Sequence, residues 1–309
     1  MTSAFSAGPE ASSSGAFERQ ASAFRQWVSG DGSTDFPVEA GRYHLYICWA
    51  CPWAHRTAIA RRLMGLEDAI GMTAVNPIRD ARGWRFTGGE YTDPLNGFAF
   101  LAQAYAATDP AFDGRASTPV LWDRVTGRIV NNESSDILRM LGTAFAPLAE
   151  HPVELYPAAQ AQAIDRIEAE LYDGLNNAVY RAGFATSQAA YETDARRVFA
   201  TLERLEERLT GSRYLLGDAI TEADWRAFTT LVRFDAVYYL HFKCNLRRIA
   251  DLPAVWGYTR DLYQQPGIAE TVRMDEIKAH YYGTHPMINP TGIVPIGPEL
   301  DFSAPHARG

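Results

Sequence analysis

One short segment constrains the fold more than any other, because it passes from a buried strand directly into a helix. Residues 42–47 contain YHLYI, an aromatic and β-branched run that predicts a buried strand. Pro52 opens the next run, whose apolar residues have helical spacing, and proline is well tolerated in a first helical turn. Residues 69–77 then predict a second strand, at the spacing that a βαβ unit requires. Cys51 therefore lies at a turn from strand to helix.

The rest of the first half predicts a hairpin and a short helix. Residues 118–123 and 128–132 are strand-like runs joined by Thr126-Gly127, and a helix with Ser and Asp in capping positions follows. Residues 78–117 form an irregular stretch rich in Gly, Asp and aromatic side chains, and a loop of that length in a compact domain is usually functional. The first half is thus predicted to be βαβ and then ββα.

From residue 158 onward, the pattern changes to long amphipathic helices and a proline-rich tail. Apolar residues recur three and four apart over three long segments, 161–180, 188–209 and 222–242. Two shorter helices are predicted at 253–263 and 275–282, and the tail after them is predicted to wrap the surface. The predicted fold class is an α/β domain followed by an all-α domain.

We expect three parts along the chain, with a join in the stretch that holds prolines at positions 147, 152 and 157. The first part is small and polar at its start and is predicted to be flexible. The predicted parts are a flexible N-terminal extension over residues 1–35, an α/β domain over 36–150 and a helical domain with its wrapping tail over 151–309.

Composition excludes several classes of partner. The formal charge of -8 and the pI of about 5.4 give no attraction to phosphate backbones or to an anionic membrane surface, so no nucleic-acid or membrane partner is expected. The chain has no long apolar run and no basic, apolar leader, which predicts a cytoplasmic protein. Its three cysteines are too few for a disulfide framework and are expected to be free thiols.

Cys51 is the candidate nucleophile. A thiol at a helix N-terminus faces unpaired backbone N–H groups and the positive end of the helix dipole, and both favour the thiolate over the thiol. The alternative interpretation is a buried cysteine that acts as a small hydrophobic residue. The strand, Cys-Pro, helix context favours the nucleophile.

Cys48 forms a Cys-x-x-Cys pattern with Cys51, so a redox pair or half of a metal site must be considered. Redox motifs of this type place the resolving thiol on the helix, where this chain has Ala54. Cys48 lies upstream instead and is interpreted as structural. No further Cys or His pair has zinc spacing, so no metal is expected.

Thr118-Pro119 begins a predicted strand, which is an unusual position for a residue that cannot donate to a sheet ladder. One solution is a cis peptide that turns the backbone of the preceding residue toward a ligand. An ordinary proline at a sheet edge is the alternative, and the local sequence does not decide between them.

Taken together, these motifs resemble the thioredoxin-like half of glutathione transferases. The segments that carry this resemblance are CPWAHR, GW, TPVLWD and NNESSDI, at residues 51–56, 83–84, 118–123 and 131–137. Downstream segments are similar to the glutathionyl-hydroquinone reductases, the Xi class of glutathione transferases. These segments are NNAVYRAGFA, RFDAVY, HFKCN, HYYG and NPTG, at residues 176–185, 233–238, 241–245, 280–283 and 289–292.

The resemblance implies a thioredoxin-like domain followed by a helical domain, and a homodimer. Glutathione is implied as a co-substrate, with no bound cofactor and with a glutathionylated aromatic substrate. The implied reaction converts a glutathionyl-hydroquinone to the hydroquinone through a mixed disulfide of Cys51 with glutathione. A second glutathione resolves this disulfide and leaves as oxidised glutathione.

The resemblance also implies roles for individual residues. Cys51 matches the catalytic cysteine of the family. The positions that match its glutathione-binding residues are Trp84, Arg115, Thr118 with Pro119, Glu133 and Ser134. The last two suit the γ-glutamyl end, because a helix N-terminus binds a carboxylate and a glutamate can accept from an ammonium group. A plain helix cap is the alternative for this pair.

Three tyrosines, Tyr180, Tyr238 and Tyr281, match residues that line the pocket for the aromatic substrate. Each alone could be a packing aromatic whose hydroxyl is satisfied. We expect Tyr180 to be the general acid, with Tyr238 and Tyr281 orienting the ring hydroxyls and stabilising the thiolate. The alternative functions are an omega-like transferase with thiol-transferase or dehalogenating activity, a conjugating transferase, and a non-catalytic interaction module on the same fold.

Overall fold

The computed structural model describes residues 10–309, so the first nine residues of the predicted extension lie outside the described residues. The described chain divides into two compact units. Unit 1 contains Gln20–Val153 and Thr271–His280, and unit 2 contains residues 10–19, Glu154–Glu270 and Tyr281–Gly309. The domain boundaries at residues 36 and 150 stay predictions, although the change of unit after Val153 falls close to the second of them.

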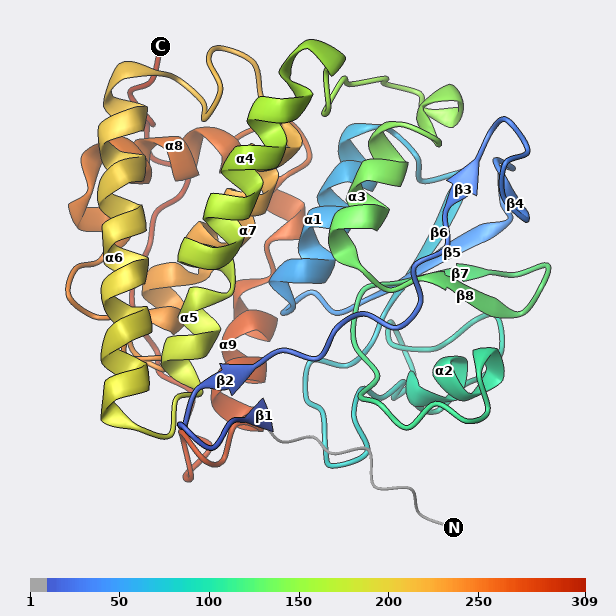
Figure 1. Ribbon diagram of the computed structural model, residues 1–309, viewed down its shortest axis with the longest axis horizontal. Helices are drawn as coiled ribbons and strands as arrows, with labels where there is room; N and C mark the ends of the chain where they lie inside the picture. Colours follow the sequence, from blue (N-terminus) through green and yellow to red (C-terminus); the bar gives the residue numbers. More distant parts are fainter. Residues whose placement is uncertain (1–9) are drawn as a thin grey trace. The chain divides into compact units, whose positions relative to one another are not determined.

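Unit 1 is built around a mixed four-stranded sheet with the strand order β6-β5-β7-β8 (Figure 1). Strand β5 pairs parallel with β6 and antiparallel with β7, and β7 pairs antiparallel with β8. Helices α1 and α3 pack against each other beside this sheet, while α2 packs against β8. These strands and helices are β5 Tyr43–Ile47, α1 Pro52–Leu63, β6 Ile70–Ala74, α2 Ala102–Thr108, β7 Val120–Asp123, β8 Arg128–Asn131 and α3 Ser134–Gly142.

The order of strands and helices in unit 1 confirms the predicted arrangement of βαβ followed by ββα. All five residues of β5 are buried, as the aromatic and β-branched run predicts. The irregular stretch over residues 78–117 was predicted without regular structure, but it contains α2. This helix has only seven residues and no capping side chain, so its sequence carries no clear start signal.

Residues 20–29, which we call the N-terminal arm, run along the edge of the sheet. Arg25 forms an antiparallel bridge with Asn131 at the end of β8, and the Gln26 N–H donates to the Val130 carbonyl (3.0 Å). Arg25 also makes two hydrogen bonds to Asp136 on α3, at 2.8 and 2.7 Å. The arm was predicted to belong to a flexible extension, whereas the structure hydrogen-bonds it to β8 and α3.

Short strand pairs accompany this arm and the segment before it. The antiparallel pair is β1 Glu10–Ala11 with β2 Phe17–Glu18, and the parallel pair is β3 Val28–Ser29 with β4 Phe36–Pro37. The Thr186 N–H donates to the Gly15 carbonyl at 2.9 Å, which fixes the segment that carries β2 onto unit 2. Gly15 has a φ of +82°, and a Cβ there would lie 2.9 Å from the Ser187 backbone, so glycine is required.

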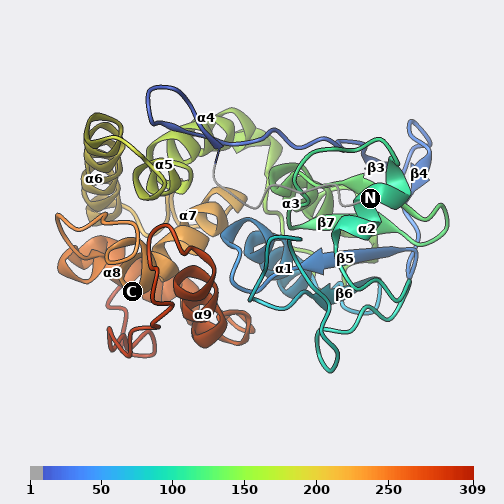
Figure 2. The same cartoon turned by 90° about the horizontal axis from the view of Figure 1, so that it is seen from below.

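Unit 2 is helical, as predicted, and its helices are visible in two orientations in Figures 1 and 2. The longest, α6, begins after Ser187, whose hydroxyl accepts from the Ala190 N–H at 3.3 Å. Helix α7 begins with the predicted capping box of Thr221 and Asp224. The helices are α4 Ala161–Leu171, α5 Ala178–Gly183, α6 Gln188–Gly211, α7 Glu222–Arg233 and α8 Pro253–Tyr263, and α9 Met274–Thr284 begins in unit 1 and ends in unit 2.

Two of the predicted long helices are interrupted, which corrects the sequence interpretation. The segment predicted as one helix over 161–180 contains a π-helical turn at Tyr172–Asn176, and the segment over 222–242 contains another at Phe234–Tyr238. In the first turn, the buried Asn176 amide donates to the Arg226 carbonyl (3.0 Å) and to the Thr230 hydroxyl (2.7 Å). Each π turn shifts the register of the residues that follow, and such turns are frequent at functional sites.

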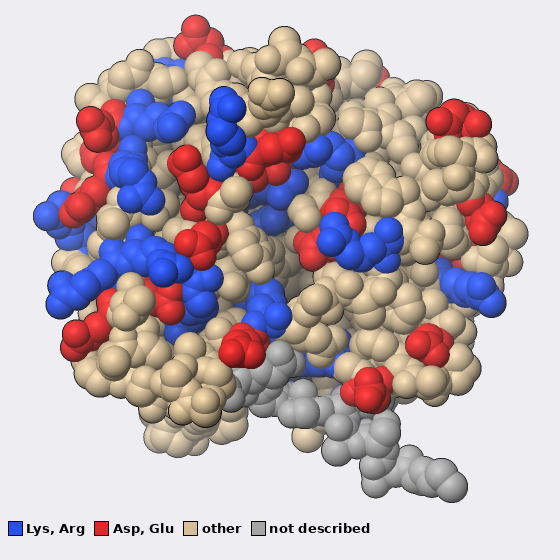
Figure 3. Space-filling model, viewed as in Figure 1, with Lys and Arg blue, Asp and Glu red and all other residues tan. Residues whose placement is uncertain are grey.

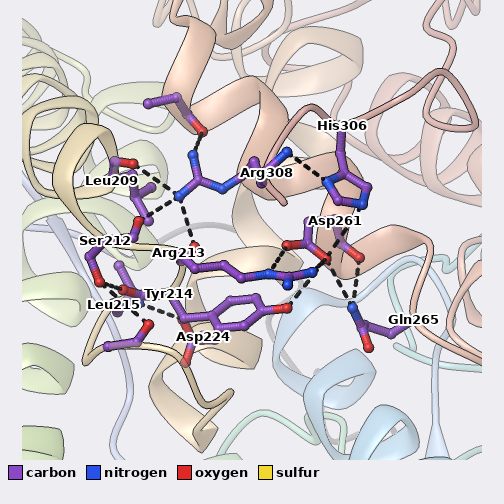
Figure 4. A network of polar contacts seen from close by, with 12 residues as sticks. Leu209, Ser212, Arg213, Tyr214, Leu215, Asp224, Asp261, Gln265, His306 and Arg308 are labelled. Carbon is purple, nitrogen blue, oxygen red and sulfur yellow. Dashed lines mark hydrogen bonds and ion pairs between the residues drawn. The ribbon is translucent and has the colours of Figure 1, made fainter.

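The C-terminal tail contains no helix or strand after α9, and Arg308 fixes its end to unit 2 (Figure 4). The Arg308 guanidinium donates to the carbonyls of Leu209, Ser212 and Arg213 at 2.9, 2.6 and 2.8 Å. These carbonyls belong to the end of α6 and the residues after it, where helix carbonyls lack partners within the helix. Nearby, Asp261 accepts two hydrogen bonds from Arg213, at 3.0 and 3.3 Å.

Replacing Arg308 with alanine should lower the free energy of unfolding by about 2 kcal/mol, because several charged hydrogen bonds to partly buried carbonyls are lost. Calorimetric melting of the full chain would measure this change. The matched control is Arg248→Ala, which removes an exposed ion pair with Asp251 and should leave the free energy of unfolding almost unchanged. Equal shifts for the two variants would contradict the role assigned to Arg308.

The charged side chains lie interspersed on the face shown in Figure 3, with acidic groups beside basic ones. In unit 2, Arg181 forms an ion pair with Asp194 at 2.7 Å, and Arg197 forms one with Asp173 at 3.1 Å. Among residues 10–309, no helix combines the length and the apolar character needed to cross a membrane.

Candidate functional site

Cys51 is the N-cap residue of α1, and it lies in the short turn that connects β5 to this helix. Its backbone is extended (φ −78°, ψ 118°), and its carbonyl accepts the first helical hydrogen bond, from the His55 N–H at 2.9 Å. Its side chain makes no capping bond to the helix. Instead, the half-buried thiol donates to the Thr118 carbonyl, with 3.6 Å between sulfur and oxygen. The sulfur therefore lies at the helix start and beside the strand β7.

The other two thiols lie in a different environment. Cys48 and Cys244 are fully buried, and no disulfide joins any of the three cysteines. Burial raises the pKa of the Cys48 thiol far above its ordinary value and raises that of Cys244 to about 12. Both remain thiols at neutral pH, because the thiolate is disfavoured away from water. Only Cys51 of the three combines exposure with a helix N-terminus.

Thr118-Pro119 has a cis peptide bond, so the structure decides between the two interpretations that the sequence left open. Thr118 is buried, and its carbonyl is the group that the Cys51 thiol contacts. Its hydroxyl is also buried and has no hydrogen-bond partner within residues 10–309. A backbone position beside the nucleophile is thus fixed at the start of β7.

Glu133 and Ser134 begin α3, with Glu133 as the N-cap residue. The Glu133 Oε1 atom accepts from the N–H and the hydroxyl of Ser135, at 3.2 and 3.0 Å, so the pair does form a helix cap. The other oxygen, Oε2, accepts from the hydroxyl of Ser22 at 2.9 Å. The cap uses one carboxylate oxygen and leaves the second available for a ligand as well as for Ser22.

Trp84 and Arg115 lie in the loop region of unit 1, on either side of α2. The buried Trp84 ring stacks on the His280 ring, with 5.0 Å between centroids, and the Arg79 guanidinium lies 5.6 Å from its centroid. His280 is itself held by the Pro77 carbonyl, at 2.7 Å from Nδ1. The Arg115 N–H donates to the Gln20 side chain at 2.8 Å, so the N-terminal arm fixes the backbone at this position.

The three predicted tyrosines meet in unit 2. The Tyr281 hydroxyl hydrogen-bonds to the hydroxyls of both Tyr180 and Tyr238, the second at 3.0 Å. Tyr238 and Tyr281 are almost fully buried, whereas Tyr180 keeps 9% of its surface exposed. The structure therefore brings together, in one hydrogen-bonded chain, three residues that come from α5, the second π turn and α9.

This tyrosine chain can deliver a proton. Three hydroxyls carry three protons, and the two hydrogen bonds within the chain use two of them. Burial, together with the neighbouring phenols, raises the pKa of Tyr281 well above its ordinary value, so this hydroxyl is protonated at neutral pH. Tyr180 is the most exposed member of the chain.

Two further residues shape the tyrosine chain. The Arg19 guanidinium lies 4.8 Å from the Tyr180 ring centroid and donates from Nε to the Asn177 side chain at 2.7 Å. The Phe242 ring stacks on the Tyr238 ring, with 5.6 Å between the two centroids. A Cβ at Gly183 would lie 2.1 Å from the Phe242 ring, so glycine is required where this ring meets α5.

The contribution of the N-terminal residues differs from the prediction, in which residues 1–35 form a flexible extension. Ser22 reaches Glu133, and Arg19 reaches Tyr180. A signal was available: Phe17, Arg19, Phe24 and Arg25 bring aromatic and basic side chains into a segment that is otherwise rich in Ser, Ala and Gly. No group of His, Cys, Asp or Glu side chains that could hold a metal ion occurs within residues 10–309.

Comparisons with known proteins agree with this architecture. Residues 50–144 match the glutathione S-transferase N-terminal domain, and residues 188–261 match the glutathione S-transferase C-terminal domain. The chain is 49% identical to the glutathionyl-hydroquinone reductase YqjG of Escherichia coli, over 96% of this chain and 93% of the relative. It is 50% identical to the glutathionyl-hydroquinone reductase PcpF of Sphingobium chlorophenolicum, over 93% of this chain and 91% of the relative.

Solved structures give the same result. The Xi-class glutathione transferase of Natrialba magadii superposes with a TM-score of 0.92 at 50% identity, covering 94% of this chain and 90% of the other. The glutathione-bound structure of E. coli YqjG superposes with a TM-score of 0.89 at 49% identity, covering 92% of this chain and 96% of the other. The predicted fold class, thioredoxin-like and then helical, is confirmed. The chain belongs to the glutathionyl-hydroquinone reductases, the Xi class of glutathione transferases.

Proposed function

We propose that the chain reduces glutathionyl-hydroquinones to hydroquinones, with glutathione as the co-substrate and Cys51 as the nucleophile. The observation that carries the proposal is the contrast among the three thiols: Cys51 is half-buried at a helix start, and the other two are fully buried. The names of YqjG and PcpF support the reaction, and the glutathione-bound structure of YqjG supports the co-substrate.

Glutathione is held, in this proposal, by unit 1. Its cysteine portion pairs with the backbone of Thr118, beside which the Cys51 sulfur lies at 3.6 Å. Its γ-glutamyl end binds at the start of α3, where Ser134 and the first N–H groups face the carboxylate and Glu133 faces the ammonium group. The remaining contacts come from the region of Trp84 and Arg115.

The first chemical step forms a mixed disulfide. The Cys51 thiolate attacks the sulfur of the glutathionyl-hydroquinone, so a sulfur–sulfur bond forms and the bond between sulfur and the aromatic carbon breaks. The electron pair of the broken bond stays on the carbon, which takes up a proton and becomes part of the hydroquinone. Because the ring can pass through its keto tautomer, a free carbanion is avoided.

The second step restores the enzyme. The thiolate of a second glutathione attacks the mixed disulfide, gives oxidised glutathione and releases the Cys51 thiolate. Across both steps, the thiol of one free glutathione and the thioether sulfur of the substrate become one disulfide, and the aromatic carbon is reduced by two electrons and takes up a proton. No second cysteine of the chain is needed, which agrees with the burial of Cys48 and Cys244.

The proton for the first step comes, we propose, from the tyrosine chain, with Tyr180 as the outward donor and Tyr281 and Tyr238 behind it. Within unit 2, the Tyr281 hydroxyl of α9 hydrogen-bonds to the hydroxyls of both Tyr180 and Tyr238.

A paired assay tests the reaction class. The purified chain is expected to release one hydroquinone and one oxidised glutathione from each glutathionyl-hydroquinone, and to conjugate glutathione to a chloro-nitroaromatic only slowly. Faster conjugation than reduction would indicate a conjugating transferase. Reduction of small glutathione disulfides or dehalogenation without hydroquinone release would indicate an omega-like transferase, and inertness in every assay would indicate an interaction module.

We further propose a cytoplasmic homodimer. The free thiols suit a reducing compartment, and the homodimer follows from family membership alone. Sedimentation velocity of the full chain is expected to give twice the monomer mass of 34.3 kDa, and a monomer at micromolar concentration would contradict the dimer.

A further inference from the structure

The N-terminal arm holds Ser22 beside Glu133, although the two residues are far apart in the sequence. On one side of Ser22, the Gln20 amide oxygen accepts from the Arg115 N–H at 2.8 Å. On the other side, the Phe24 N–H donates to the Asn132 side chain at 2.9 Å, and the Asn132 N–H donates back to the Phe24 carbonyl at 2.9 Å. Ser22 is therefore fixed from both directions along the chain.

The Ser22 hydroxyl faces the start of α3. Its oxygen lies 2.9 Å from the Glu133 Oε2 atom and 3.3 Å from the Asn132 carbonyl oxygen. Since a carboxylate and a carbonyl can only accept, the single hydroxyl proton of Ser22 is directed toward them. The two lone pairs of the Ser22 oxygen are not used in these bonds.

From this geometry we propose that Ser22 is a specificity-determining residue for glutathione, and that it recognises the free ammonium group of the γ-glutamyl end together with Glu133. This inference rests on the proposed function, because that function places the γ-glutamyl end at Glu133 and Ser134. An ammonium group has three N–H donors and needs several acceptors in one place. The Glu133 Oε2 atom and the Ser22 oxygen are two adjacent acceptors of this kind.

Ser22 also positions Glu133. The Ser135 N–H and hydroxyl hold the Oε1 atom, and Ser22 holds the Oε2 atom, so both carboxylate oxygens are fixed before a ligand arrives. When an acceptor is already fixed in the free protein, less side-chain conformational entropy is lost on binding. The effect of Ser22 should therefore depend on whether the ligand carries the ammonium group, which a purely structural serine would not show.

The test compares two ligands by titration calorimetry: glutathione and its analogue that lacks only the α-amino group of the γ-glutamyl residue. In the Ser22→Ala variant, the affinity for glutathione should fall about tenfold, as expected for loss of one hydrogen bond to a charged group. The affinity for the deamino analogue should change by less than about twofold, because the analogue has no ammonium group to bind.

Two further variants complete the design. Ser22→Thr keeps the hydroxyl and should restore most of the discrimination between the two ligands. Ser14→Ala is the matched control, because the exposed Ser14 hydroxyl bonds only Ser12, at 2.8 Å, among the contacts described for it. This control should bind both ligands as the unsubstituted chain does. The same variants assayed with glutathionyl-hydroquinone should show a raised KM for glutathione with little change in kcat.

The outcomes separate this inference from the proposed function. Equal losses for glutathione and the deamino analogue in Ser22→Ala would show a structural role only and would overturn the inference, while leaving the reaction untouched. An unsubstituted chain that does not bind glutathione would overturn the proposed function. Normal binding with the predicted discrimination but without hydroquinone release would support the role of Ser22 and contradict the proposed reaction.

Discussion

A Cys51→Ala variant is expected to lose hydroquinone release by roughly 10⁴-fold or more, because removal of a covalent nucleophile removes the whole bond-forming step. Cys51 is the half-buried thiol at the start of α1, and its loss leaves only fully buried thiols in the chain. The variant should still bind glutathione, since no proposed contact to the γ-glutamyl end depends on the sulfur. Steady-state rates of hydroquinone release, with calorimetric glutathione binding alongside, measure both expectations.

Cys48→Ala is the matched control for this prediction. Cys48 lies three residues earlier, is fully buried, and has a pKa that burial raises far above neutrality. Its removal should change kcat/KM by less than about threefold, apart from any effect on stability, because a buried thiol is inert. Substantial deglutathionylation by Cys51→Ala, or an equally inactive Cys48→Ala that remains folded, would contradict the single-thiol mechanism.

The second large effect is expected at Tyr180. Tyr180→Phe removes the hydroxyl of the most exposed residue of the tyrosine chain and should lower kcat for glutathionyl-hydroquinone by about a hundredfold, the lower end of general-acid contributions. The proton is needed only when the aromatic carbon leaves. Reduction of a preformed disulfide between Cys51 and glutathione should therefore proceed at the unsubstituted rate, which stopped-flow measurement of each half-reaction would show.

Tyr282→Phe is the control for this variant. Tyr282 follows Tyr281 in α9 and is buried, but its hydroxyl donates to the Ala236 carbonyl at 3.0 Å, and burial raises its pKa to about 12. Loss of this hydroxyl should lower the free energy of unfolding by about 1 kcal/mol and leave the rates of both half-reactions unchanged. If Tyr180→Phe slows both half-reactions, the role of Tyr180 is structural. If it does not slow the release of hydroquinone, Tyr180 is not the general acid.

Much of the fold was predictable because local pattern and tertiary structure agree. The buried run before Cys51, the hairpin around Thr126-Gly127 and the capping box at Thr221 each have a local physical signal, and each element appears where predicted. The π turns had no such signal. They depend on contacts across helices, such as the buried Asn176 bonding to α7, and hydrophobic periodicity averages over an inserted residue.

The candidate site was predictable to a similar degree. The meeting of Tyr180, Tyr238 and Tyr281 follows from their motifs, and the structure joins them by hydrogen bonds. The roles of Ser22 and Arg19 were not predictable in this way, because a polar segment without periodicity gives no indication of where its backbone hydrogen bonds go. In the structure, backbone groups of the N-terminal arm hydrogen-bond to the end of β8, and this pairing places Ser22 beside Glu133.

The central claim is that Cys51 takes glutathione from the aromatic substrate as a mixed disulfide. Mass spectrometry of the intact chain, quenched with acid after mixing with glutathionyl-hydroquinone in the absence of free glutathione, tests it most directly. One glutathione adduct per chain is predicted, located on Cys51 by peptide mapping and removed when glutathione is added. An unmodified chain that has nevertheless released hydroquinone, or an adduct located on Cys48 or Cys244, would contradict the claim.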